Sequence, residues 1–127
     1  MWGRIFRGMW RSGNRFMNDD SSSNPEILFE IVTPLGFCVR TTTEYWQFIV
    51  TVKHPIMINR LTEVQNTLSD PDEVRLSNTD AQVYLFYRND GTKRWVCAVT
   101  RRLNGEGFLI TAYRTSAIKE GEQLWQK

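Results

Sequence analysis

The sequence predicts an α+β domain in which two helices pack on an antiparallel sheet of about four strands, preceded by a β-hairpin. Three observations lead to this fold class. Short runs rich in β-branched and aromatic residues recur near the start of the domain and again in its second half. Between them, the apolar residues change to helical spacing. The turns between the later runs are short, which is typical of antiparallel neighbours.

The first predicted elements are the hairpin and the two helices. EILFEIVT and GFCVRTT, joined by PLG, are predicted to form the hairpin. In TEYWQFIVTV the apolar residues follow helical spacing, and Pro55 must end that helix near Lys53 or His54. A second helix is expected to follow, with one apolar face and SDPD as its stop signal; that face consists of Met57, Leu61, Val64 and Leu68.

Strands are predicted again from residue 74 onward. VYLFYR, RWVCAVTRRL and GFLITAYRT are joined by NDGTK and NGEG, which contain the strong turn signals Asp-Gly and Asn-Gly. VRLS at 74–77 is expected to add an edge strand, and SAIKEGEQLW a closing turn or short helix.

A polar linker, NDDSSSNP at 18–25, predicts a boundary between residues 1–24 and a domain at 25–127. No run approaches the roughly 18 consecutive apolar residues of a membrane-spanning helix, and the N-terminus lacks the apolar stretch of a secretory signal. We therefore expect a cytoplasmic protein. The N-terminal segment adds the alternative of peripheral membrane association.

Metal and cofactor chemistry is not expected. The two cysteines, Cys38 and Cys97, lie far apart in apolar surroundings, and a single histidine cannot complete a zinc site with them. The net charge of +2 conceals a basic region, because residues 84–114 hold six basic side chains against two acidic ones. Such a region suggests a polyanionic ligand, although solvated strand edges explain it equally well.

The only histidine, His54, lies between Lys53 and Pro55. Proline is favoured at the first position of a helix, so His54 is expected at or beside a helix N-cap. The helix end would attract an anion such as phosphate, and the same field with Lys53 would keep the imidazole neutral. A general base for RNA cleavage needs such an imidazole. A capping histidine without chemistry is the alternative, and on this stretch alone the more frequent one.

Alternation along the strands predicts a polar sheet surface. In ITAYRT, Thr111 and Tyr113 share one face, and in VYLFYR, Arg88 shares a face with Tyr84. We expect these side chains to gather on one surface beside His54, as in RNA-binding sheets whose aromatic residues stack on bases. A solvated sheet face is the alternative.

Four stretches, YWQFIVTVKHP, LSDPDEVRLS, VYLFYR and GEGFLITAYRT, together resemble the phage-associated nucleases of the barnase–EndoU–colicin–RelE superfamily. The resemblance runs from about residue 27 to 125. Members are metal-independent ribonucleases or their relatives, frequently toxins of toxin–antitoxin or phage-defence systems. The resemblance implies attack of a 2′-hydroxyl on the adjacent phosphate, which leaves a 2′,3′-cyclic phosphate.

The resemblance also implies roles for individual residues. The histidine of KHP is His54, the general base or acid, and Arg88 would neutralise the developing phosphorane charge. TAY contributes Thr111 and Tyr113, which would bond the phosphate or protonate the leaving oxygen. With no second histidine, the second proton carrier stays open. The expected RNA-binding residues are Lys53, Arg60, Tyr84, Arg102 and Arg114.

Two further interpretations stand beside the nuclease. A non-catalytic interaction protein on the same scaffold would act through its basic sheet face or its N-terminal segment. In that segment, residues 2–17 are predicted to form an amphipathic helix with four arginines on one side. It would dock on a protein partner such as an antitoxin, or lie on an anionic membrane. A cysteine nucleophile paired with His54 would need an exposed thiol of lowered pKa.

Overall fold

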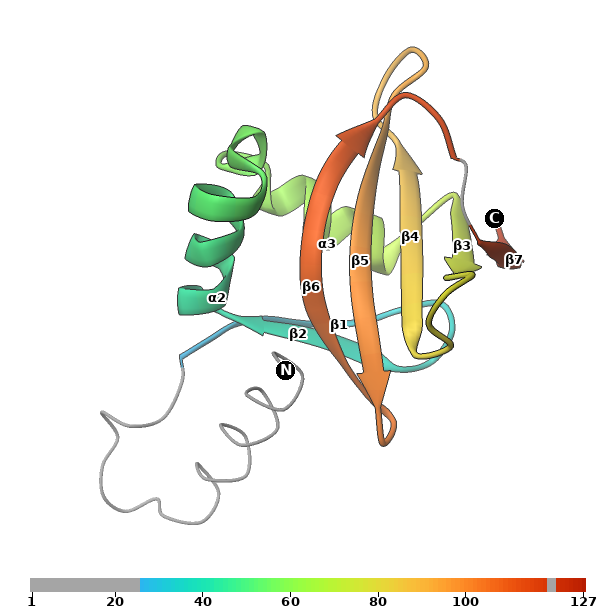
Figure 1. The fold of residues 1–127 in the computed structure, drawn as a ribbon, viewed down its shortest axis with the longest axis horizontal. Helices are drawn as coiled ribbons and strands as arrows, with labels where there is room; N and C mark the ends of the chain where they lie inside the picture. Colours follow the sequence, from blue (N-terminus) through green and yellow to red (C-terminus); the bar gives the residue numbers. More distant parts are fainter. Residues whose placement is uncertain (1–25, 119–120) are drawn as a thin grey trace.

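A seven-stranded mixed sheet forms the centre of the domain, with strand order β1-β2-β6-β5-β4-β3-β7. The computed structural model describes residues 26–118 and 121–127 (Figure 1). The α+β fold class is confirmed, but the expected hairpin and four-stranded sheet are joined into one larger sheet. The strands are β1 (Ile27–Val32), β2 (Cys38–Thr42), β3 (Glu73–Leu76), β4 (Val83–Asn89), β5 (Trp95–Leu103), β6 (Glu106–Thr115) and β7 (Glu122–Gln126).

The helical region follows β2 in four consecutive pieces. They are the α-helix α2 (Thr43–Phe48), the π-helical turn η2 (Ile49–Lys53), the 3-10 turn η3 (Pro55–Met57) and the α-helix α3 (Leu61–Ser69). The expectation that a second long helix begins beside His54 is wrong, because Pro55 starts only a single 3-10 turn. Successive i→i+3 hydrogen bonds, such as Met57 N to His54 O, curl the chain here and bury Met57 completely.

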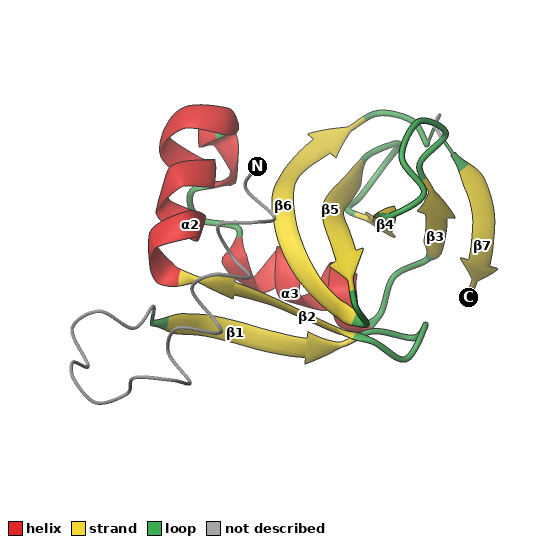
Figure 2. Cartoon of the chain, turned by 60° about the horizontal axis from the view of Figure 1, so that its bottom comes forward, coloured by secondary structure: helices red, strands yellow, loops and turns green. Residues whose placement is uncertain are grey.

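Two apolar clusters lie on opposite faces of the sheet. On one face, α3 contributes Val64 and Leu68 to a large core that includes Phe86 of β4. On the other face, Tyr87 and Cys97 belong to a smaller cluster against which Tyr113 packs. Figure 2 shows the sheet strongly curved between β6 and β7, with the helices on one side. The curvature brings several strand side chains of the second face together without a helix over them.

The hairpin joins the sheet through a short parallel pairing between β2 and β6. Only Val39 with Gly107 and Arg40 with Phe108 take part. Glycine is required at 107, because a Cβ there would lie 2.8 Å from the Cys38 carbonyl oxygen and 2.9 Å from the Phe37 ring. Among the described strands, none pairs with this side of β6 beyond Phe108. The remaining edge of β6 instead contacts η2 and η3.

A β-bulge interrupts β6 on its other side. Val99 pairs with Thr111 and Thr100 with Leu109, so Ile110 is left without a partner on β5. The extra residue resets the alternation of β6 relative to a regular strand. Beyond it, Tyr113 pairs with Cys97 and lies on the face of the smaller cluster.

The C-terminal expectation is also wrong, because residues 122–126 form β7 and not a turn or helix. β7 pairs antiparallel with β3, which brings Trp125 opposite Val74 and against the large core. No described helix is both long and apolar enough to cross a bilayer. The predicted amphipathic helix at 2–17 and the linker at 18–25 lie outside the described residues.

Candidate functional site

The bulge at Ile110 creates the polar centre of the candidate site. Its carbonyl oxygen accepts a hydrogen bond from Tyr45 Oη at 2.9 Å and a longer one from Lys53 Nζ at 3.4 Å. Lys53 Nζ also lies 3.4 Å from Tyr45 Oη. Two donors from the helical region thus satisfy a carbonyl that strand pairing leaves open. This bond pair fixes α2 and η2 against β6.

His54 lies beside this point, where the chain passes from η2 to η3. Its backbone N–H donates to Ile49 O at 2.8 Å, and its backbone dihedral angles are φ −143° and ψ 80°. Its partly exposed ring lies 5.5 Å, centroid to centroid, from the ring of Tyr113. His54 and Tyr113, predicted to lie together, are therefore in contact. η3 has only three residues, so the anion site expected from a long helix end is not formed there.

Burial changes the acid–base properties of the groups that flank His54. Desolvation raises the pKa of Tyr45 to about 12, so its phenol stays protonated at neutral pH. Desolvation also lowers the pKa of the Lys53 ammonium, which lies 5.7 Å from the centre of the Phe48 ring. A partly desolvated ammonium interacts more strongly with a nearby anion than one in bulk water does. Lys53 therefore suits contact with a phosphate at the edge of β6.

Thr111 contributes a hydroxyl without a hydrogen-bond partner. Its Oγ1 is buried and finds no partner among the described residues. An unsatisfied buried hydroxyl costs about 1–3 kcal/mol, which an ordered water or a ligand can offset. Thr111 pairs with Val99 and Tyr113 with Cys97, so the two side chains share a face of β6. The sequence prediction that they lie on one face is confirmed.

Two of the predicted arginines, Arg88 and Arg114, lie on the face of the sheet opposite Tyr113. One row of paired residues across β4, β5 and β6 consists of Arg88, Val96 and Arg114. The next row consists of Tyr87, Cys97 and Tyr113. Because successive side chains alternate between faces, Arg88 and Arg114 lie on the side of α3, away from Tyr113. The expected gathering of all these residues on one surface is not what the structure shows.

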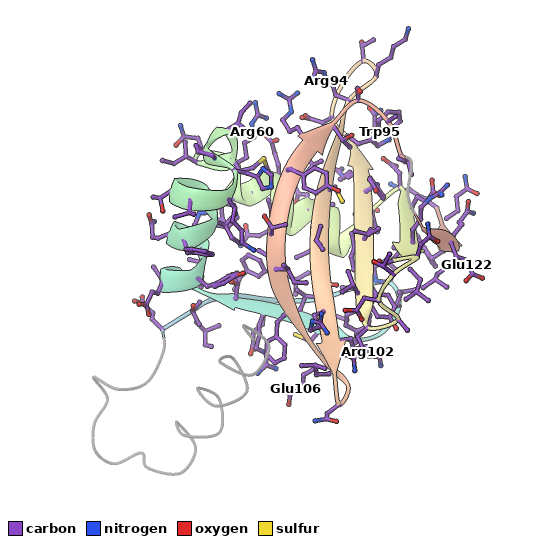
Figure 3. All side chains as sticks on the ribbon, in the orientation of Figure 1. Arg60, Arg94, Trp95, Arg102, Glu106 and Glu122 are labelled. Carbon is purple, nitrogen blue, oxygen red and sulfur yellow. The ribbon has the colours of Figure 1, made fainter. Side chains whose placement is uncertain are left out.

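Each of these arginines has a carboxylate nearby. Arg114 Nε lies 2.8 Å from Asp90 Oδ2, and Arg60 lies 3.8 Å from the same oxygen. Arg88 Nε donates to the Asp70 carbonyl at 3.1 Å, and its guanidinium lies 3.8 Å from the Asp70 carboxylate. Asp90 therefore joins Arg60 of the helical region to Arg114 of β6. Figure 3 shows Arg60 toward the end of the sheet where Arg94 and Trp95 lie.

Arg102 and Tyr84 lie elsewhere. The Arg102 guanidinium lies 4.5 Å from the centre of the Phe37 ring, and the Tyr84 ring is 5.2 Å from Phe37. Figure 3 places Arg102 near the opposite end of β5 from Trp95. Their packing on Phe37 is a structural role for both residues, separate from the edge that carries His54.

Sequence reasoning missed three residues that shape the site. Tyr45 follows the apolar helical spacing, so nothing in the sequence distinguishes it from a core residue. The bulge at Ile110 has no glycine or proline to mark it. Asp90 belongs to a turn signal, which explains its place in the chain without any pairing to arginine. All three depend on contacts between distant segments.

Metal ligands do not gather in the part of the chain that the structure describes: it holds no group of three or more His, Cys, Asp and Glu side chains suited to a metal ion. Cys97 is fully buried, which does not suit an exposed nucleophile. In comparisons with known proteins, no family model, curated protein or solved structure matches the chain.

Proposed function

We propose that this protein is a metal-independent endoribonuclease, active as the toxin of a toxin–antitoxin or phage-defence system. The observation that carries the proposal is the contact between His54 and Tyr113 where η2 and η3 meet the edge of β6, with Lys53 at the same edge. Cleavage of RNA by its own 2′-hydroxyl uses a general base, a general acid and a group that stabilises the developing negative charge, and an imidazole, a phenol and a partly desolvated ammonium can fill these roles.

The proposed reaction needs one proton acceptor and one proton donor. His54 accepts the proton of a ribose 2′-hydroxyl as its oxygen attacks the adjacent phosphorus. The bond from phosphorus to the 5′-oxygen of the next nucleotide breaks, and that oxygen takes a proton from Tyr113. The products are a 2′,3′-cyclic phosphate and a 5′-hydroxyl. No water is consumed in this step.

Charge stabilisation is assigned to the groups nearest the reacting edge. Lys53 would interact with the phosphate. The Thr111 hydroxyl is buried, so it would act on the phosphate only through an ordered water. Arg114 lies on the other face of the sheet from Tyr113, where Asp90 partly neutralises both it and Arg60. These two arginines would therefore hold only phosphates farther along the RNA. The geometry favours Lys53 over Arg88 for the phosphorane charge, because Arg88 lies on the other face beside Asp70.

The test is cleavage of total RNA by the purified full chain in EDTA, with mass spectrometry of the product ends. We expect 2′,3′-cyclic phosphate ends and a loss of about 10²-fold or more in His54→Ala. Arg102→Ala is the matched control, because Arg102 packs on Phe37 away from this edge. A 3′-hydroxyl end, or an unchanged rate in His54→Ala, would contradict the mechanism.

One observation favours the non-catalytic alternative. Val52 and Ile56, on either side of His54 in the chain, are 64% and 61% exposed. Apolar residues beside a polyanion site are more typical of protein interfaces than of RNA-binding surfaces. To test this alternative, total RNA is incubated with the isolated full chain, with and without added cell extract. RNA that stays intact in both reactions would support a non-catalytic interaction protein.

A further inference from the structure

The helical region carries an exposed apolar surface, here called the helix patch and defined by Phe48, Val52, Ile56 and Ile58. Their exposures are 41%, 64%, 61% and 56%. The other exposed large apolar residues of the described chain, Ile27, Val32 and Leu124, are scattered over the edge strands β1 and β7. Single exposed apolar residues are ordinary, but four within an eleven-residue stretch suggest a covered surface.

We propose that residues 2–17 of the same chain dock their apolar side on the helix patch. The first argument is the sequence of that segment. With about 100° per residue, its four arginines fall on one side of a helix and its large apolar residues on the other. The apolar residues are Trp2, Ile5, Phe6, Met9, Trp10 and Phe16. Three glycines weaken an isolated helix, so the segment needs a surface in order to fold.

The second argument is reach. Thr43 N, at the start of α2, donates to Glu26 O at 3.0 Å, so the preceding chain enters the domain beside α2. The eight residues 18–25 can span up to about 28 Å. At about 1.5 Å per residue, the stretch from Thr43 to Ile58 is about 24 Å long. The segment therefore reaches every part of the helix patch without displacing β1.

The third argument is charge. Glu44 is exposed one turn before Phe48 in α2, and Glu26 is exposed where the chain enters. These carboxylates can pair with arginines at the border of the docked segment, as polar rims do around apolar interfaces. A short linker gives an effective concentration in the millimolar range, so an intrinsic dissociation constant of about 0.1 mM would leave the segment docked about ten to one.

Docking does not depend on the proposed ribonuclease activity.

Hydrogen–deuterium exchange of the full chain tests the proposal. In Ile5→Asp/Trp10→Asp, backbone amides of residues 48–58 should exchange about tenfold faster than in the unaltered chain, as the ten-to-one docking ratio implies. Reciprocally, Val52→Asp/Ile56→Asp should speed exchange in residues 2–17, while the matched control Val32→Asp, 67% exposed on β1, should not. Unchanged exchange in β5 shows that each variant is folded.

Three results would overturn the proposal. Exchange that is the same in all variants would mean that the segment does not touch the patch. Protection that rises with protein concentration would assign the patch to a second copy of the chain. Protection that arises only with vesicles containing phosphatidylglycerol would assign the segment to a lipid surface. Because none of these readouts uses RNA, they remain distinct from failure of the proposed function.

Discussion

Replacing Tyr45 by phenylalanine removes one hydroxyl from the edge of β6 and leaves the ring in place. That hydroxyl donates to the Ile110 carbonyl at 2.9 Å and lies 3.4 Å from Lys53 Nζ. Both partners lie next to His54 and Tyr113 in the candidate site. Tyr45→Phe therefore tests how firmly the bulge is tied to the helical region.

The expected loss of stability follows from the hydrogen-bond partners. An intramolecular hydrogen bond contributes about 0.5–1.5 kcal/mol net. Lys53 Nζ still donates to Ile110 O at 3.4 Å in the variant, so the carbonyl keeps a donor. We therefore expect a loss of about 0.5–1 kcal/mol, from the lower half of that range. For a domain of this size, Tm should fall by roughly 2–8 °C.

The loss should depend on pH in a defined direction. The pKa of Tyr45 is raised from 10.0 to about 12 in the folded protein by burial. The folded state thus holds this proton more tightly than the unfolded state. The resulting stability is fully present below about pH 10 and is lost as pH rises toward 12. Tyr45 is only partly buried, so solvent reduces the free energy that this shift represents. The stability advantage of the unaltered chain over Tyr45→Phe should therefore shrink as the pH rises above 10.

Urea unfolding followed by circular dichroism between pH 7 and 11.5 measures these differences. Alkaline titration at 295 nm, taken as the difference between the two proteins, reports the Tyr45 phenol directly. Tyr84→Phe is the control, because it removes the same atom from a ring that packs on Phe37. Equal stability at pH 7, or curves that stay parallel to pH 11.5, would refute the role given to the Tyr45 hydroxyl.

Three other changes probe the fold and the site. Gly107→Ala should destabilise the domain by about 1–3 kcal/mol in urea unfolding, because the new Cβ would meet the Cys38 carbonyl at 2.8 Å; an unchanged midpoint would contradict the close approach. Asp90→Asn removes the carboxylate charge that Arg60 and Arg114 share, and it should cost under about 1 kcal/mol in stability. Because both arginines are released, fluorescence anisotropy should show tighter RNA binding with a steeper salt dependence. Arg88→Ala should lower the cleavage rate less than His54→Ala does. An equal loss in single-turnover kinetics would mean that Arg88, and not Lys53, stabilises the charge on the phosphorane.

The sequence by itself determined the elements whose signals are local. The antiparallel order of β4, β5 and β6 follows from the two turns, where Gly91 and Gly105 adopt φ of 102° and 83°. The apolar spacing also identified the buried face of α3, since Val64 and Leu68 are fully buried. Turn chemistry and periodicity are set within a few residues, so one sequence suffices to read them.

The tertiary structure alone decided how these elements meet at the site. The parallel contact of β2 with β6 joins residues almost seventy positions apart, and the bulge at Ile110 arises where β6 leaves that contact for the helical region. The bulge and the pairing of β4, β5 and β6 then determine the face of the sheet on which each side chain lies. As a result, Arg88 and Tyr113 lie on opposite faces. A shift of one residue in register exchanges the two faces of a strand. No local pattern specifies that register, because it is set by packing between segments that are distant in the chain.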